Sequence, residues 1–264
     1  MMTNSELEIY DTIIIGGGQA GLSVAYFLQK TKLKYLILDN QSEPGGAWQH
    51  TWDSLKLFSP AQYSSLSGWQ MPATENEYPT KLEFLNYLSN YEKRYDFPIK
   101  RDTIVINVSK KNDFFQLETN NGLFLCKTLV SATGAANSPY IPEYHNAHLF
   151  KGKQIHSINY KCPNDLHNQK VLLVGAGNSG SQILAEVSKT TQTTWVTIEP
   201  PVFLPEHIDG RYLFIQANNS YLKKSSNTKS EKISLINIVQ VESVKEGLTR
   251  GIYKDHKPFS SFYE

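Results

Sequence analysis

Two glycine-rich loops carry the residues best suited to chemistry in this sequence. The first glycine loop, residues 16–21, reads GGGQAG, and the second glycine loop, residues 175–180, reads GAGNSG. In a G-x-G-x-x-G loop the first glycine forms a tight turn, the second lets the backbone approach a pyrophosphate, and the third lets a helix pack closely on a strand. Each loop therefore predicts a dinucleotide-binding site.

The context of the first loop matters, because an isolated G-x-G-x-x-G pattern is a weak signal. A β-branched run at 10–15 precedes the loop, a helical pattern follows over 22–30, and another strand is predicted over 35–39. Asp39 lies 21 residues after Gly18, where a carboxylate would hold the adenosine ribose hydroxyls. The apolar residues expected on one face of the helix are Val24, Phe27 and Leu28.

The second loop repeats this arrangement. A strand is predicted over 171–174, a helix over 181–189 and a strand over 194–199, which ends in Glu199, 22 residues after Gly177. In both units the free N–H groups and the dipole of the helix N-terminus favour negatively charged phosphates. Two dinucleotide sites in one chain indicate a resident flavin, FAD, and a nicotinamide dinucleotide, NAD(P)H, that delivers hydride to it.

These units predict an α/β fold with two doubly wound, Rossmann-like dinucleotide-binding domains. The FAD domain is placed at 1–160 and the smaller NAD(P) domain at 161–264. Residues 40–80 are irregular but rich in aromatic residues, which is typical of a functional segment rather than a disordered one. The polar stretch 218–232 is interpreted as a mobile surface loop. A helix is predicted over 81–95 with an apolar stripe of Leu82, Leu85, Leu88 and Tyr91, and strands are predicted at 103–109, 113–119, 122–125 and 128–132.

The composition argues against several other classes of protein. The 264 residues carry a formal net charge of +1 and no Lys/Arg stripe, so no nucleic-acid partner is expected. The N-terminus lacks an apolar signal segment, and no apolar run is long enough to span a bilayer, so no membrane partner is expected. The two cysteines, Cys126 and Cys162, form no metal-binding pattern and favour a reducing, cytoplasmic setting. No metal site is predicted.

A longer pattern lies between the two glycine loops. Residues 150–161 match F-x-G-x-x-x-H-x-x-x-Y-K at every fixed position. With this pattern the sequence resembles the flavin-containing monooxygenase family, the class B flavoprotein monooxygenases, over nearly the whole chain. Segments 57–62 and 203–211 are similar to a bacterial branch of ArsO-like and cation-efflux-associated flavoproteins. Further matches to the family are the turn Gly45-Gly46-Ala47-Trp48 and the linker Ala132-Thr133-Gly134.

The resemblance implies that NAD(P)H reduces FAD and that the reduced flavin traps O₂ as a C4a-(hydro)peroxide, which transfers one oxygen atom to a small soft nucleophile. The expected partners are thus a small-molecule substrate and O₂, and a homo-oligomer is left open. The residues predicted to bind FAD are Gly16, Gly18, Gln19, Ala20, Gly21, Asp39, Gly45, Gly46, Trp48, Ala132, Thr133 and Gly134. Those predicted to bind the nicotinamide dinucleotide are Gly175, Gly177, Asn178, Ser179, Gly180, Glu199 and Arg211.

Three features depart from the family's pattern. Members of this branch continue further at the C-terminus, so the chain is expected to be truncated, with one wall of the flavin site missing. Many members carry an asparagine after the G-G-x-W turn, whereas residues 57–60 here read LFSP, which leaves Ser59 and Gln62 as the catalytic candidates. Finally, Glu199 suits a ribose 2′-hydroxyl and favours NADH, although Arg211 could reach a 2′-phosphate and NADPH fits the family.

Several alternatives stand beside this hypothesis. A flavin disulfide reductase shares the two-dinucleotide architecture, but it needs a redox cysteine pair, and the two cysteines here are 36 residues apart. A truncated chain could instead be a non-catalytic dinucleotide-binding protein that acts as a sensor or partner subunit. A two-component flavin reductase is a third alternative. Bound yellow chromophore would argue against a non-catalytic role.

Overall fold

The computed structural model describes residues 8–223 and 237–261, and the chain forms two compact units. The first unit comprises residues 1–50 and 64–139, and the second comprises residues 51–63 and 140–264. The sequence-based division at residue 160 differs from this one. The residues just before 160 and the segment 51–63 group with the second unit because they pack there, as in the hydrogen bond from the Asp53 amide to the Lys161 carbonyl (3.0 Å).

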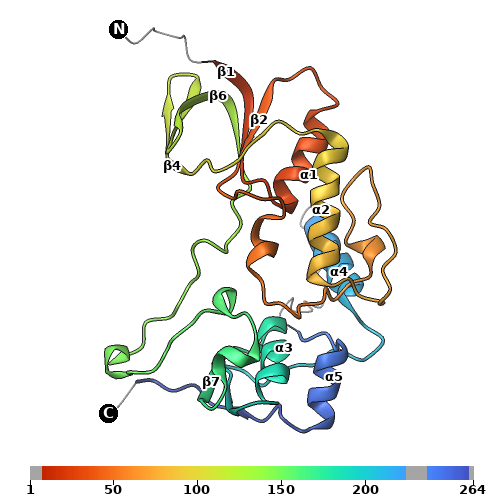
Figure 1. The fold of residues 1–264 in the computed structure, drawn as a ribbon, viewed down its shortest axis with the longest axis vertical. Helices are drawn as coiled ribbons and strands as arrows, with labels where there is room; N and C mark the ends of the chain where they lie inside the picture. The colour runs from red at the N-terminus through yellow and green to blue at the C-terminus, as the bar shows by residue number, and fades with distance from the viewer. Residues whose placement is uncertain (1–7, 224–236, 262–264) are drawn as a thin grey trace. The chain divides into compact units, whose positions relative to one another are not determined.

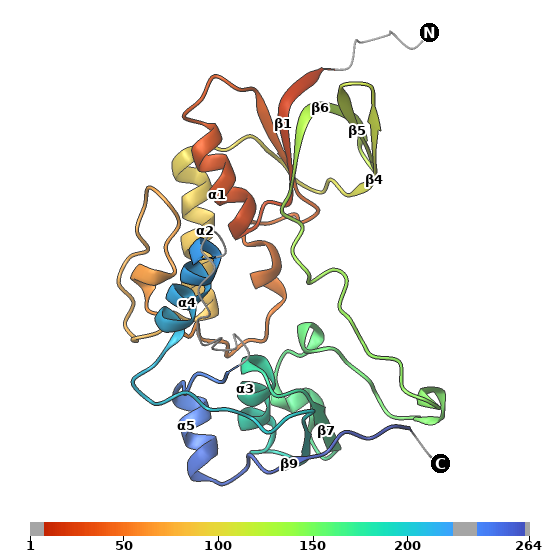
Figure 2. The same ribbon diagram turned by 180° about the vertical axis from the view of Figure 1, so that it is seen from behind.

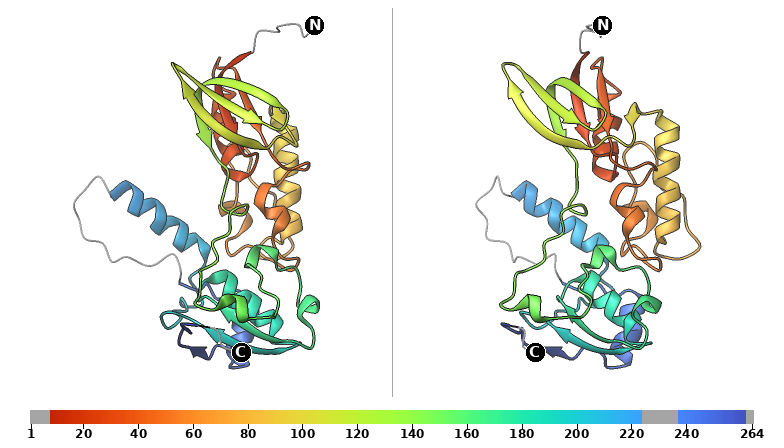
Figure 3. Two further views of the ribbon diagram at one scale, coloured as in Figure 1. Left: turned by 90° about the vertical axis from the view of Figure 1, so that its left-hand side faces the viewer. Right: turned by 60° about the vertical axis from the view of Figure 1, so that its left-hand side comes forward.

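The first unit is built on a six-stranded sheet with the order β3-β2-β1-β6-β5-β4. Strands β3, β2, β1 and β6 run parallel, β5 pairs antiparallel with β6, and β4 pairs antiparallel with β5 (yellow-green in Figure 3). β6 is one strand where two short ones were predicted, because its first half pairs with β5, its second half pairs with β1, and Leu125 and Cys126 in the middle pair with both. The strands are β1 (Ile9–Ile15), β2 (Tyr35–Leu38), β3 (Ile99–Lys100), β4 (Val105–Lys111), β5 (Phe114–Thr119) and β6 (Gly122–Ser131).

Helix α1 (Gln19–Leu28) buries a different face from the one the sequence pattern predicted. Its buried residues are Gly21, Leu22 and Ala25, whereas Phe27 is 56% exposed and packs edge-on against the ring of the adjacent Tyr26. The small residues face the sheet because the helix must approach β1 closely at the glycine loop. The expected stripe through Phe27 was therefore wrong.

Helix α2 (Lys81–Tyr95) has the predicted bounds and lies beside α1 (Figures 1 and 2). It begins with a capping box formed by Thr80 and Glu83, which satisfies backbone N–H groups of the first turn. The predicted stripe was wrong at Leu82, which is 68% exposed. Leu88 and Tyr91 are buried as predicted, and Tyr87, which the stripe did not include, is buried as well. The Tyr87 and Tyr91 hydroxyls donate to the carbonyls of Trp69 (2.7 Å) and Ser67 (2.6 Å), so both polar groups are satisfied in the interior.

The second unit contains a parallel sheet with the order β7-β8-β9. Its strands are β7 (Lys170–Val174), β8 (Gln192–Val196) and β9 (Asp255–His256), and its helices are α3 (Asn178–Val187), α4 (Gly210–Lys223) and α5 (Glu242–Thr249). The loop predicted over 218–232 is helical up to Lys223, and its remainder lies outside the described residues. Short 3₁₀ turns occupy Gly46–His50, Ala61–Tyr63, Ala147–Leu149, Ser157–Asn159 and Pro163–Leu166.

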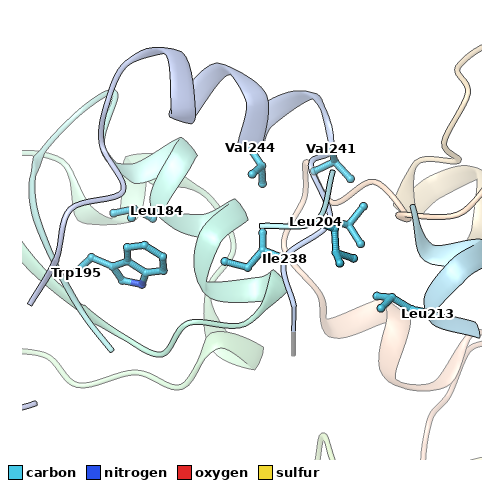
Figure 4. Packing of buried hydrophobic residues seen from close by; sticks show 8 residues of the cluster. Leu184, Trp195, Leu204, Leu213, Ile238, Val241 and Val244 are labelled. Carbon is cyan, nitrogen blue, oxygen red and sulfur yellow. The ribbon is translucent and has the colours of Figure 1, made fainter. Parts of the chain in front are cut away.

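A hydrophobic cluster holds the helices of the second unit together (Figure 4). Trp195 of β8 is 1% exposed, and its indole N–H donates to the Gly175 carbonyl (2.8 Å). The core is thereby tied directly to the second glycine loop. The buried members of the cluster are Leu184, Trp195, Leu204, Leu213, Ile238, Val239, Val241 and Val244.

Among the described residues, no helix is both long enough and apolar enough to cross a bilayer.

The two cysteines are expected to differ in reactivity. Cys126 in β6 is fully buried, and burial raises the pKa of its thiol, so little thiolate forms at neutral pH. Cys162 is partly exposed. We expect a thiol-specific dye to label one cysteine in the folded chain and both in denaturant. The Cys162→Ser variant should show no rapid labelling, and two rapidly reacting thiols in the native protein would contradict the buried position of Cys126.

Candidate functional site

The first glycine loop connects β1 to α1. The structure gives a different reason for glycine at each of the three fixed positions of its G-x-G-x-x-G pattern. Gly16 has φ +104°, and a Cβ there would lie 2.4 Å from the Ala132 carbonyl oxygen. A Cβ on Gly21 would lie 2.0 Å from the Gly16 oxygen. Gly18 differs, because its φ of −82° suits any residue and the nearest atom to a Cβ, in Gly46, is 3.6 Å away. Packing therefore requires glycine at positions 16 and 21 but not at 18.

The G-G-A-W turn lies against this loop. Gly46 has φ +52°, and a Cβ on it would lie 2.7 Å from the Gly18 Cα. The Trp48 indole N–H donates to the Gln19 side chain (3.4 Å), and the Trp48 ring packs edge-on against Phe84 of α2. The structure thus brings together four of the predicted FAD residues, Gly18, Gln19, Gly46 and Trp48. Ala132 joins them, since its amide donates to the Ile15 carbonyl (2.8 Å).

Asp39 lies directly after β2 and is 2% exposed. Its carboxylate lies against the first glycine loop, since a Cβ on Gly17 would be 2.8 Å from Asp39 Oδ2. That oxygen forms an ion pair with Arg101, whose guanidinium also pairs with Glu92 of α2. Burial raises the pKa of Glu92, Arg101 opposes that shift, and the charge on Asp39 adds to it. Sequence reasoning missed Arg101 and Glu92, since no spacing rule links either residue to the loop.

The second glycine loop connects β7 to α3 in the same way. Gly175 has φ +119°, and a Cβ on Gly180 would lie 2.5 Å from the Gly175 oxygen. Gly177 has φ −87°, and no atom lies within 4 Å of the position of a Cβ on it. The Asn178 side chain is hydrogen-bonded to the Asn237 carbonyl (3.1 Å) and the Val239 amide (2.8 Å), and its predicted contact with the cofactor stays a prediction. Ser179 is exposed.

Thr197, and not Glu199, occupies the position equivalent to Asp39. In the first unit Ile15 pairs with Leu38, the residue before Asp39, and in the second unit Val174 pairs with Val196, the residue before Thr197. Sequence spacing placed the acid two residues too late because strand ends are not defined by spacing alone. The Thr197 hydroxyl donates to Asp255 Oδ2 (3.3 Å).

The remaining nicotinamide candidates lie at the exposed end of β8 and the start of α4. Glu199 is exposed, beyond the strand. Arg211 bonds twice to the buried carboxylate of Asp209, through Nε (2.8 Å) and Nη2 (2.8 Å). Its guanidinium carbon lies 5.7 Å from the centroid of the Tyr63 ring. Its proposed contact with a 2′-phosphate stays a prediction, since in this conformation the guanidinium is engaged by Asp209.

The family-identifying segment, residues 150–161, folds onto the second unit. His156 Nδ1 accepts from the Ile158 amide (3.2 Å) and so caps a 3₁₀ turn. Tyr160 is 2% exposed, and its hydroxyl donates to Glu186 of α3 (3.0 Å), which also accepts from Ser54. Burial, and then the charge of Glu186, raise the pKa of the Tyr160 hydroxyl. These contacts anchor the segment and do not prepare Tyr160 as an acid or base.

The catalytic candidates lie on the segment 51–63 of the second unit. Ser59 follows Phe58, whose carbonyl accepts from the Gly210 amide (2.7 Å), and it is partly buried. Gln62 is exposed within a 3₁₀ turn. Their roles stay predictions. Among the residues that the structure describes, no cluster of three or more His, Cys, Asp or Glu could hold a metal ion.

A repeated strand, glycine loop and helix, each with its first strand paired in parallel in a separate sheet, define an α/β protein with two dinucleotide-binding units. A family model described as pyridine nucleotide-disulphide oxidoreductase matches residues 13–257. The solved structure of a flavin-containing monooxygenase from Stenotrophomonas maltophilia matches 97% of this chain and 72% of its own, with 40% identity and a TM-score of 0.87.

Relatives identified by sequence point to the same kind of protein. The uncharacterised oxidoreductase CzcO of Bacillus velezensis is 41% identical over 206 residues, which is 78% of this chain. A probable indole-3-pyruvate monooxygenase of Arabidopsis thaliana, YUCCA1, is 31% identical over 214 residues, which is 79% of this chain. The chain therefore belongs to the flavin-containing monooxygenase family, as the sequence predicted. It spans about 60% of the length of the CzcO relative and 52% of that of YUCCA1.

Proposed function

We propose that this chain binds FAD at the first glycine loop and NAD(P)H at the second, and acts as a flavin-dependent monooxygenase on a small soft nucleophile. One observation carries the proposal. Gly18 and Gly177 both have backbone angles open to any residue, and neither has a neighbour that a Cβ would strike. Since the fold itself does not need glycine at these two positions, the space above them suits a ligand that approaches the backbone, as a pyrophosphate does.

The residues around the first loop fit FAD. The N-terminus of α1 directs backbone N–H groups and a positive dipole end at the loop, and Gly18 is its N-cap residue. The buried Asp39 carboxylate would accept hydrogen bonds from the adenosine ribose. When bound, the flavin supplies hydride acceptance and activation of O₂. The protein's part is to bind and orient both dinucleotides and to exclude water from the reacting centre.

The second loop fits a nicotinamide dinucleotide, with Thr197 in place of an acid at the ribose position. The Thr197 hydroxyl donates to the Asp255 carboxylate, so a carboxylate still lies beside this position, and the choice between NADH and NADPH is left to the measurement below. Disulfide reduction is the weaker alternative. Both cysteines are free thiols, and they lie in different units, with Cys126 buried within β6.

An absorbance spectrum of the purified 264-residue chain tests the proposal. We expect flavin bands that bleach on addition of NADH or NADPH without oxygen and return when air is admitted, and the faster reductant identifies the preferred nicotinamide. Oxygen transfer should then be sought with amines and thioethers. A chain that stays colourless after incubation with FAD would contradict the proposal and favour a non-catalytic role.

A further inference from the structure

Arg101 lies between two carboxylates at the edge of the first glycine loop. It follows β3, one of its terminal nitrogens pairs with Asp39 after β2, and the other pairs with Glu92 on α2. The side chains of Arg101, Asp39 and Glu92 are 19%, 3% and 11% exposed, respectively. This buried triad joins β2 to α2 and β3, since Arg101 is 62 residues from Asp39 and nine from Glu92.

The triad is poorly arranged for stability alone. Removing charged groups from water costs several kcal/mol per ion, and good geometry must offset that cost. Here Glu92 Oε1 is buried without a hydrogen-bond partner among the described residues, and burial raises the pKa of this carboxyl group. Two carboxyl groups share the single guanidinium of Arg101. Buried charge that is incompletely compensated is more typical of a functional site than of a structural one.

The orientation of Asp39 shows what the triad does. Its backbone is held on both sides, by the Lys100 carbonyl (3.0 Å) and the Thr103 amide (2.8 Å). Oδ2 is used by Arg101 and lies against Gly17. In the described part of the chain no hydrogen bond involves Oδ1. Asp39 therefore offers one fixed oxygen, at the position where the carboxylate of such folds accepts from a ribose.

We propose that Arg101 is a positioning residue that makes this site selective for a ribose with a free 2′-hydroxyl. Arg101 holds Asp39 in a single orientation, and Glu92 fixes the guanidinium from the other side. Because both terminal nitrogens of Arg101 are engaged by Asp39 and Glu92, they are not free to bind a 2′-phosphate, and the Asp39 carboxylate repels such a group. The first site thus takes FAD and rejects NADPH. This inference rests on the proposed FAD site.

Ligand competition on the full chain tests the inference. We would measure the Kd of FAD, of ADP and of 2′-deoxy-ADP for the wild type and for Arg101→Gln, Arg101→Lys and Arg94→Gln. Arg94 is a matched control, because it is exposed on α2 and lies over the Trp69 ring. Unfolding of each ligand-free variant is followed in parallel, so that a folding defect is recognised.

In the wild type we expect ADP to bind about tenfold more tightly than 2′-deoxy-ADP, the size of one charge-assisted hydrogen bond. Arg101→Gln should raise the Kd of FAD and of ADP by about tenfold and that of 2′-deoxy-ADP far less, because only the first two donate to the oriented carboxylate oxygen of Asp39. Arg101→Lys should retain part of the difference in Kd between ADP and 2′-deoxy-ADP, and Arg94→Gln should leave all three Kd values unchanged. Equal weakening of ADP and 2′-deoxy-ADP would overturn the positioning role and leave the FAD site standing. A wild type that binds neither FAD nor ADP would overturn the proposed function as well.

Discussion

Gly18→Ala is expected to leave the chain folded and to abolish most of its flavin binding. The φ of −82° suits alanine, and the nearest atom to the new Cβ would be an ordinary 3.6 Å away. The methyl group would nevertheless occupy the space that a pyrophosphate needs above the helix N-terminus. Loss of one or two charge-assisted hydrogen bonds corresponds to a rise of about 10- to 100-fold or more in the Kd of FAD. Flavin fluorescence titration measures the Kd, and circular dichroism follows the fold.

Gly21→Ala is the matched control, because the same methyl group is expected to act by a different route. At that position the Cβ would lie 2.0 Å from the Gly16 oxygen, so the helix must move away from the strand. We expect a loss of about 3 kcal/mol or more in the free energy of unfolding. If Gly18→Ala unfolded the protein to the same degree, or bound FAD normally, the first loop would not be the pyrophosphate site.

Gly177→Ala should weaken the binding of the nicotinamide dinucleotide without affecting the binding of the flavin. The residue has φ −87°, and nothing lies within 4 Å of the position of its Cβ, so we expect the second unit to stay folded. Flavin should bind as in the wild type, while the concentration of NADH or NADPH needed for half-maximal reduction rises by about tenfold or more. Anaerobic reduction followed at the flavin absorbance band measures this directly.

Two controls sharpen this result. Dithionite should still bleach the flavin of Gly177→Ala, because the flavin itself is unaffected. Gly180→Ala places a Cβ 2.5 Å from the Gly175 oxygen and should destabilise the second unit, whose core is tied to that loop through the Trp195 N–H. Unchanged reduction kinetics in Gly177→Ala would mean that the nicotinamide binds elsewhere.

The sequence alone determined the kind of protein. Periodicity and β-branched runs identified β1, β2, β7 and β8, and the spacing of the glycines identified the turn that each first strand makes into a helix. These inferences succeeded because they depend on properties of single residues and near neighbours. Gly16, for example, takes a φ of +104° because glycine has no Cβ to oppose that angle. The apolar pattern over 81–95 likewise predicted the bounds of α2.

Only the tertiary structure decided which residues meet at the sites. It exposed Leu82, which the apolar pattern had placed on the buried face, and it buried Tyr87, whose hydroxyl donates to the Trp69 carbonyl 18 residues away. It put Thr197 where spacing had suggested Glu199, since strand register sets that position. It also placed Arg101 between Asp39 and Glu92. The physical reason is common to all three: partners distant in the chain, and not local propensity, determine which side chains are buried, paired or left open to a ligand.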